Sequence, residues 1–175
     1  MGMDSLAGSL LVASPHLLDP NFFRSVVLIL EHNEEGAVGV IINQPSTSGL
    51  DGELPEWAGL LADPQVVFVG GPVQPEAAVG LADGVDGSPV AGVGVVDLSA
   101  PPGELSAPVR IYAGYAGWGP GQLEAELEEG GWIVSEALAA DVFAAAPGTL
   151  WTEVLKRQPG VTSLLASFPI DPGLN

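Results

Sequence analysis

Acid–base chemistry in this chain would depend on a few residues near the N-terminus and one distant arginine. His16 and Asp19 lie in a turn-rich segment, and Ser25 follows them. A serine, a histidine and an aspartate that meet in one pocket can carry out nucleophilic hydrolysis, and Arg110 could bind an anionic group of the substrate. Closeness in sequence does not establish that geometry. A hydrolase that uses Asp19, His16 and Arg110 is therefore the alternative hypothesis, and a structural, hydrogen-bonded His16 is favoured.

The sequence lacks a complete motif for binding a metal, a phosphate or a nucleotide. The chain has no cysteine, which excludes thiolate catalysis and cysteine-ligated zinc. It has no Gly-Lys pair for a phosphate-binding loop, and Gly117 and Gly119 begin a dinucleotide fingerprint in which Gln122 replaces the third glycine. His32 lies in a polar loop, where a solvated side chain is favoured over a metal ligand. We therefore expect no cofactor and no metal.

The segment with the most unusual composition is residues 114–124, with the sequence GYAGWGPGQLE. Glycine loses more conformational freedom on folding than any other residue, so this clustering indicates unusual dihedral angles or a close approach of two backbones. Tyr115 and Trp118 have two interpretations: they fill the core where a strand turns into a helix, or they form the walls of a cleft. In the second interpretation, backbone amides near Gly119 would receive an anion or a carbonyl group.

We predict that this segment borders a cleft that binds a small ligand or a protein partner. The predicted cleft residues are Asn43, Gly70, Gly71, Pro72, Arg110, Tyr115, Gly117, Trp118 and Gly119. Arg110 again has two interpretations, a structural ion pair with one of the many carboxylates and a cation at the edge of the cleft. We assign no catalytic residue in this cleft.

The charge of the chain restricts its partners. It has 22 acidic and 4 basic residues among 175, a net charge of −18 at pH 7. Nucleic acids and anionic membrane surfaces both attract lysine and arginine, so we expect neither as a direct partner. Solubility is the favoured reason for the acidity, and a basic protein partner is the second interpretation. The N-terminus lacks the basic region of a signal peptide and the apolar runs are short, which predicts a cytoplasmic protein.

Strand-length apolar runs must position these residues. We predict strands over 9–13, 25–31, 37–42, 66–69, 77–81, 93–98, 109–113 and 132–134, and helices over 54–62, 120–129, 135–144 and 150–158, followed by a tail from 160. The second and third runs form a hairpin that is apolar on both faces and should be covered on both sides. At the second helix, Gly119 is the expected N-cap, and Gln122 should reach back to its amide. Adjacent strands with irregularly interspersed helices predict a single α+β domain over 1–175, with 170–175 as a flexible tail.

Four segments of the chain resemble one protein family. The string GYAGWGPGQLEAELEEGGW at 114–132 is similar to the signature of the AlgH/YqgE-like family of bacterial proteins. Residues 11–26, with LVASP, DPNF and SV, also resemble that family, as do GVIINQP at 39–45 and VGGPV at 69–73. The resemblance implies a curved, barrel-like, largely antiparallel mixed sheet flanked by short helices.

The resemblance says less about activity. A transcriptional-regulator label accompanies the family, but the net charge of this chain disfavours direct DNA binding. Some members carry a reactive cysteine, and its absence here means that a thiol-based role does not transfer. The leading hypothesis is a regulatory or adaptor protein that binds a small ligand or a protein partner through the predicted cleft. Hydrolysis is the alternative, a DNA-binding regulator is less favoured, and the sequence does not predict an oligomeric state.

Overall fold

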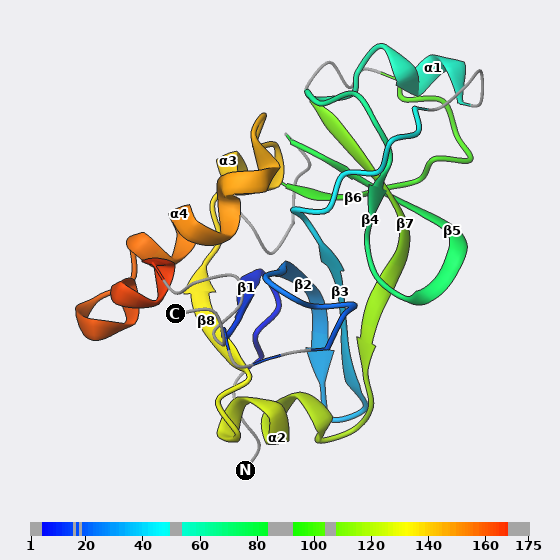
Figure 1. Ribbon diagram of the computed structural model, residues 1–175. Coiled ribbons are helices and arrows are strands. Elements are labelled where there is room, and N and C mark those ends of the chain that lie inside the picture. The colour runs from blue at the N-terminus through cyan, green and yellow to red at the C-terminus, as the bar shows by residue number, and fades with distance from the viewer. Residues whose placement is uncertain are drawn as a thin grey trace.

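The computed structural model describes residues 5–15, 17, 19–49, 54–83, 93–103 and 108–167 (Figure 1). Its main feature is an eight-stranded sheet in the order β6-β5-β7-β3-β2-β1-β8, in which β4 also pairs with β7, in parallel. The strands are β1 (Ser9–Ala13), β2 (Val26–Asn33), β3 (Gly36–Ile41), β4 (Phe68–Val69), β5 (Val73–Ala82), β6 (Gly94–Val96), β7 (Val109–Trp118) and β8 (Trp132–Glu136). The predicted single α+β domain is confirmed, but the sheet is open, with β6 and β8 at its ends, and does not close into a barrel.

Short helices flank the sheet. They are α1 (Pro55–Ala58), α2 (Gln122–Glu128), α3 (Ala139–Val142), α4 (Leu150–Lys156) and two 3-10 helices, Pro147–Thr149 and Gly160–Ser167. In Figure 1, α3 and α4 lie along one side of the sheet, α2 lies across its lower end, and α1 lies at the opposite end. No helix in the described part of the chain is long and apolar enough to cross a bilayer.

Several of the predicted helices differ from the structure in their bounds. The helix predicted over 54–62 is a single turn, and residues 135–136 of the helix predicted over 135–144 complete β8. Residues 160–167 of the predicted tail form a 3-10 helix, while the tail predicted over 170–175 lies outside the described residues.

The central strands are apolar on both faces because the sheet carries a hydrophobic cluster on each side. Along β1, Leu10 and Val12 belong to a cluster that contains Trp151 of α4, whereas Leu11 and Ala13 belong to a second cluster that contains Trp118. Burying an aliphatic side chain of this size contributes about 1.5–3 kcal/mol, so both clusters hold helices against the sheet. Strands β2 and β3 also contribute to both clusters, which confirms that their hairpin is covered on both faces.

Strand β7 joins the two halves of the sheet and contains part of the glycine-rich segment. Its first half pairs with β4 and β5, and its last residues pair with β3. The chain is therefore strand as far as Trp118, where a turn was predicted from residue 114. Gly114 has a φ of +75°, and a Cβ atom there would press on the Gly71 carbonyl oxygen. This glycine crossing, formed by Gly70, Gly71 and Gly114, confirms the prediction of an unusual dihedral and a close backbone approach for Gly114.

Candidate functional site

Trp118, the last residue of β7, is largely a core residue. Only 6% of its surface is exposed. Its indole N–H donates to Glu126 Oε1 over 3.0 Å, and the Trp132 indole N–H donates to the same oxygen over 2.8 Å. The two indole rings pack edge to face with centroids 6.0 Å apart, and Phe22 packs against both. Of the two interpretations of Trp118, core packing therefore accounts for most of its ring.

The turn after Trp118 fixes the start of α2 through one side chain. The Gly119 amide donates to Gln122 Oε1 over 3.0 Å, as predicted. The amide group of Gln122 donates in turn to Glu126 Oε2 over 2.9 Å. The helix begins later than predicted, because Gly121, with a φ of +75°, is its N-cap. We call Glu126, with its donors Trp118, Trp132 and Gln122, the Glu126 clamp.

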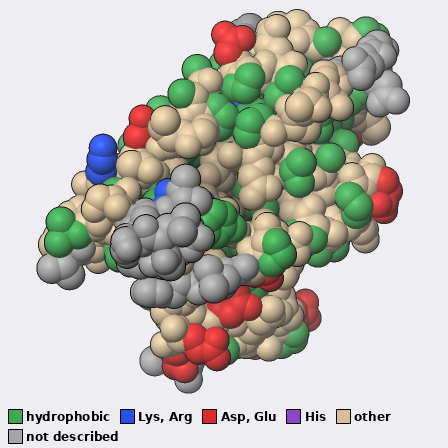
Figure 2. All heavy atoms as spheres, in the orientation of Figure 1, with side chains coloured by type: hydrophobic (Ala, Val, Ile, Leu, Met, Phe, Trp, Pro, Cys, Tyr) green, Lys and Arg blue, Asp and Glu red, His purple; other side chains and the backbone are tan. Residues whose placement is uncertain are grey.

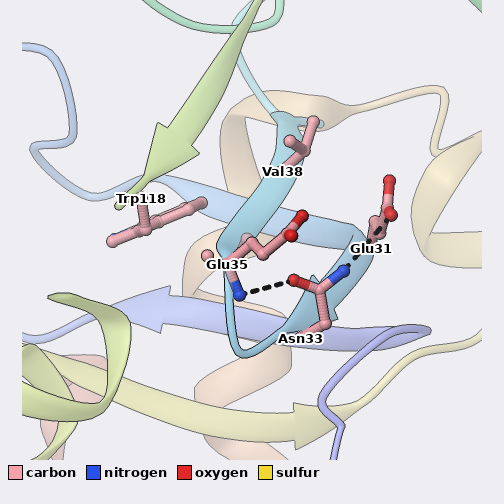
Figure 3. A pocket seen from close by; sticks show the side chains of 7 residues that line it. Glu31, Asn33, Glu35, Val38 and Trp118 are labelled. Atoms are coloured by element: carbon pink, nitrogen blue, oxygen red, sulfur yellow. Dashed lines mark hydrogen bonds between the residues drawn. The ribbon is translucent and has the colours of Figure 1, made fainter. Parts of the chain in front are cut away.

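One side of Trp118 borders a surface hollow of about 180 Å³ at the turn between β2 and β3. This Trp118 hollow is lined by Glu31, Asn33, Glu35, Gly36, Ala37, Val38 and Trp118. Figure 3 shows Trp118 on one side and the polar side chains of the hairpin on the other. A Cβ atom at Gly36 would overlap the Trp118 carbonyl, so the glycine lets the hairpin turn lie against the end of β7.

The polar lining of the Trp118 hollow consists of two carboxylates and an amide. Asn33 Oδ1 accepts the Glu35 backbone N–H over 2.8 Å, which orders the turn. Asn33 Nδ2 donates to Glu31 Oε1 over 3.4 Å. Both glutamates and Asn33 are exposed at this edge. The arrangement offers a ligand hydrogen-bond acceptors and negative charge at the end of β7.

Further acidic side chains lie on α2 and in the hairpin turn. Glu124, Glu128 and Glu129 lie on or directly after α2, and Glu34 lies in the hairpin turn. In Figure 2, acidic side chains gather at the lower end of the molecule, where α2 lies.

Three of the four basic residues of the chain, Arg24, Lys156 and Arg157, lie away from the lining of the Trp118 hollow. Arg157 pairs with Asp141 over 2.6 Å, and Lys156 lies in the last turn of α4. The Arg157 pKa is raised, chiefly by its hydrogen bonds with Asp141. The guanidinium of Arg24 stacks on Trp151, 4.2 Å from the ring centroid. None of these cations lines the Trp118 hollow, so its carboxylates face solvent without a basic neighbour in its lining.

Arg110 corrects both interpretations made from the sequence. It is only 1% exposed, so it does not lie at the edge of a cleft, and no carboxylate within the described ranges pairs with it. Its donors instead reach backbone oxygens of Ala62, Asp63, Pro64, Val142 and Ala144 over 3.0–3.4 Å. Its guanidinium also lies 4.2 Å from the Phe68 ring centroid. Burial lowers the Arg110 pKa, an effect that Tyr112 and Asp63 oppose.

The other predicted cleft residues fall into separate places. Gly71 and Pro72 line a second hollow of about 130 Å³, together with Pro20, Asn21, Ile41, Gln44 and Val69. Asn43 lines neither this hollow nor the Trp118 hollow. Its side-chain oxygen accepts the Val26 backbone N–H over 2.9 Å, and its side-chain nitrogen donates to the Arg24 backbone oxygen over 3.0 Å. Gly70 is buried at the glycine crossing, Tyr115 packs on the first cluster, and Gly117 and Gly119 are exposed next to Trp118. The structure thus divides the predicted cleft in two, and ligand binding by these residues stays a prediction.

The residues of the hydrolase hypothesis do not share a described pocket. Asp19 is exposed, and its carboxylate accepts the Asn21 N–H over 2.8 Å in a local turn, whereas Arg110 is buried. Ser25 is buried and donates to the Phe22 oxygen over 2.8 Å. His16 lies outside the described residues. Within the described ranges, no three acidic or histidine side chains are grouped for a metal ion.

His32 corrects another expectation. It was predicted to be a solvated loop residue, but it lies in β2 and is 8% exposed. Its Nδ1 accepts the Leu6 backbone N–H over 2.9 Å, and its Nε2 lies 3.0 Å from Glu124 Oε1. The signal in the sequence is the order Glu31-His32-Asn33, in which two polar residues flank the histidine. Had the predicted strand been extended to Asn33, where β2 ends, this alternation would have placed His32 on the inward face.

The chain matches known proteins along almost its full length. A family model described as AlgH-like matches residues 10–163. A UPF0301 protein from Streptomyces coelicolor is 50% identical over 188 residues, covering 99% of this chain and 97% of the relative. A UPF0301 protein from Mycobacterium tuberculosis is 48% identical over 182 residues, covering 97% of this chain and 90% of the relative.

Two solved structures share the fold. The crystal structure of protein DIP2367 from Corynebacterium diphtheriae has a TM-score of 0.85 and 34% identity, covering 92% of this chain and 91% of that one. The solution structure of the AlgH protein from Pseudomonas aeruginosa has a TM-score of 0.68 and 28% identity, covering 95% of this chain and 96% of that one. Both matches support the single-domain α+β architecture.

Proposed function

Since the chain belongs to the AlgH-like family, we propose that it is a regulatory or adaptor protein that binds a basic protein partner through the Trp118 hollow. One observation carries the proposal: a hollow of about 180 Å³ whose charged groups are the carboxylates of Glu31 and Glu35, beside Trp118. This narrows the sequence hypothesis of a glycine- and aromatic-lined cleft to a single place and a single kind of partner.

The size of the hollow favours a side chain over a free metabolite. Sites for drug-sized molecules typically enclose roughly 300–1,000 Å³, and the Trp118 hollow, at about 180 Å³, is smaller. A single lysine or arginine side chain projecting from a partner surface needs less room. Hot spots of protein interfaces are formed by such anchors in small pockets, and arginine is among the most common.

The chemistry of the lining favours a cation. Carboxylates form strong, charge-assisted hydrogen bonds with guanidinium and ammonium groups. The apolar lining residues Ala37 and Val38 supply contact to the methylene stems that carry these groups. The net charge of −18 would steer a basic partner toward the protein and repel nucleic acids.

Titration with a defined peptide tests the proposal. In NMR spectra at low salt, acetyl-tetra-arginine amide should shift the indole resonance of Trp118 and the amides of the β2–β3 turn, whereas the tetra-glutamate peptide should not. Replacing Glu31 and Glu35 with glutamine removes both charges of the lining and should weaken arginine-peptide binding about tenfold.

The control variant removes equal charge elsewhere. Glu56 in α1 and Glu76 in β5 are exposed and lie outside the Trp118 hollow. The E56Q/E76Q variant should bind the arginine peptide within about twofold of the unmodified protein. Equal weakening in both double variants would mean that the peptide responds only to net charge, and the proposed site would be wrong.

A further inference from the structure

His32 connects the N-terminal segment of the chain to α2. Its Nδ1 accepts the Leu6 N–H over 2.9 Å, and its Nε2 faces Glu124 Oε1 at 3.0 Å. The Ser5 hydroxyl also donates to the His32 backbone oxygen over 3.2 Å. The imidazole, with 8% exposure, is therefore the point at which residues 5–6, β2 and α2 meet.

These partners define the protonation state of the ring. A backbone N–H can only donate, so Nδ1 must carry a lone pair, and the hydrogen-bond network assigns the single ring proton to Nε2. Nε2–H then donates to Glu124. A second proton on Nδ1 would point at the Leu6 N–H and abolish that bond, while it would strengthen the attraction to Glu124. Glu124 is the charged group that faces the ring from α2, and the N-terminal segment presents the Leu6 amide.

The same ring is next to the lining of the Trp118 hollow. Glu31 and Asn33 line the hollow from either side of His32 along β2, and alternation along the strand directs His32 to the opposite face. Leu6 packs against the hydrophobic cluster that contains Trp118. A change at His32 therefore reaches the hollow by two routes: the strand that carries its carboxylates, and the cluster in which Trp118 is packed.

We propose that His32 is a proton-operated latch that regulates the Trp118 hollow, an inference that rests on the proposed binding of a basic partner there. In neutral solution the latch is closed, with Leu6 bonded to His32 and packed against the cluster. Protonation of the ring releases the Leu6 amide and loosens the segment that covers the cluster. It also adds a positive charge behind Glu31 and Asn33, which opposes a cationic side chain in the hollow. Both effects weaken partner binding in acid.

The test follows the latch and the binding separately between pH 7.5 and 5.5, a range in which histidine titrates and ordinary carboxylates remain charged. The Leu6 amide should lose its protection from hydrogen exchange, relative to the intrinsic rate at each pH, as the pH falls. Over the same range, affinity for acetyl-tetra-arginine amide should fall about fivefold, because the protonated ring adds one positive charge on the strand that carries Glu31.

Three variants isolate His32 from every other titrating group. His32→Asn places an oxygen near the Nδ1 position and can accept the Leu6 N–H without titrating, so both pH effects should disappear. His32→Gln places its amide near Nε2, retains a donor for Glu124 and should leave the Leu6 amide unprotected at both pH values. His16→Gln removes the other histidine of the chain and should retain both pH effects.

The two hypotheses fail in different ways. A Leu6 amide with equal protection at pH 7.5 and 5.5 would overturn the latch. Peptide affinity that falls equally in the protein and in its His32→Asn variant would also overturn it. Absence of peptide binding at pH 7.5 would instead overturn the proposed function, whatever the Leu6 amide does.

Discussion

Two charged side chains of this protein are satisfied without an opposite charge, and they act on different parts of the structure. Arg110 is almost fully buried and donates to five backbone oxygens from residues 62–64, 142 and 144. Glu126 is half-buried, and its carboxylate accepts from the side chains of Trp118, Trp132 and Gln122. We call the first arrangement the Arg110 knot, beside the Glu126 clamp defined above.

We expect the Arg110 knot to matter for the stability of the fold and the Glu126 clamp to matter for the proposed binding surface. The Arg110 knot binds backbone from segments distant in sequence, so its loss affects the chain path itself. The Glu126 clamp orients side chains at the edge of the Trp118 hollow, so its loss affects the shape of a surface. Two glycines with the same φ of +75° show the same contrast. A Cβ atom on Gly114, at the glycine crossing, would collide with backbone atoms, whereas a Cβ atom on Gly121, at the start of α2, would have no atom within 4 Å.

The largest expected effect is in the Arg110 knot. Arg110→Met preserves much of the apolar stem but leaves one buried and four partly buried carbonyl groups without their donor. Each such group costs about 1–3 kcal/mol when water does not reach it, so the free energy of unfolding should fall by about 3–5 kcal/mol in urea denaturation. Lys156→Met removes an exposed cation and should change stability by less than about 0.5 kcal/mol. Similar small losses in both variants would show that the knot does not stabilise the fold.

The next effect compares two glycines with the same backbone dihedral. Gly114→Ala and Gly121→Ala both place a side chain at a φ of +75°. The conformational cost is about 1 kcal/mol for each, but only Gly114 adds an overlap with the Gly71 and Val73 oxygens. We expect losses of about 3 kcal/mol at Gly114 and about 1 kcal/mol at Gly121 in the same denaturation experiment. Equal losses would mean that the crossing relaxes and that close approach is not the reason for glycine there.

The Glu126 clamp should give a smaller loss of stability with a local spectroscopic change. Glu126→Ala leaves two partly buried indole N–H groups without their acceptor, which costs about 2 kcal/mol in total. The indole resonances of Trp118 and Trp132 should both move upfield in NMR spectra. Glu128→Ala removes an exposed carboxylate from the same helix and should change neither quantity appreciably. If the two alanine variants behave alike, the clamp does not hold the two indole rings in place.

Local patterns predicted most of the fold. The continuous apolar runs at 25–31 and 37–42 indicated a hairpin with two buried faces, and the bond from the Gly119 amide to Gln122 followed from a spacing of three residues. The end of β7 was missed because glycines disfavour strands, and only the pairing partner β3 makes residues 116–118 a strand.

The site was less predictable because its determinants are distant in sequence. Arg110 lies 32–48 residues from its acceptors, and His32 lies 92 residues from Glu124. No single sequence pattern encodes such pairings. The role predicted for Trp118 stays a prediction: the residue lines a hollow whose carboxylates come from the predicted hairpin, Glu31 from its first strand and Glu35 from its polar loop.

The smallest expected effect at neutral pH concerns Tyr112, a buried neighbour of Arg110. Its hydroxyl is buried and has no hydrogen-bond partner among the described residues, although the nearby Arg110 charge favours the phenolate. Burial nevertheless raises the pKa of Tyr112 well above its ordinary value. Tyr112→Phe removes an unsatisfied polar atom, so stability at pH 7 should change by less than about 1 kcal/mol, toward greater stability.

The sign of the pH effect then distinguishes Tyr112 from the other tyrosine. A group whose pKa is raised on folding contributes stability that is complete below the unfolded pKa, about 10 for tyrosine, and is lost as the pH rises through and above it. The unmodified protein should therefore lose stability above about pH 10 relative to Tyr112→Phe, while Tyr115→Phe should follow the unmodified protein. Denaturant unfolding at pH 8 and 10.5 measures the difference. Equal losses of stability in the unmodified protein and in Tyr112→Phe would show that the Tyr112 hydroxyl reaches water in the folded state. The surroundings of Arg110 would then not be closed to solvent, and their contrast with the surface-facing Glu126 clamp would not hold.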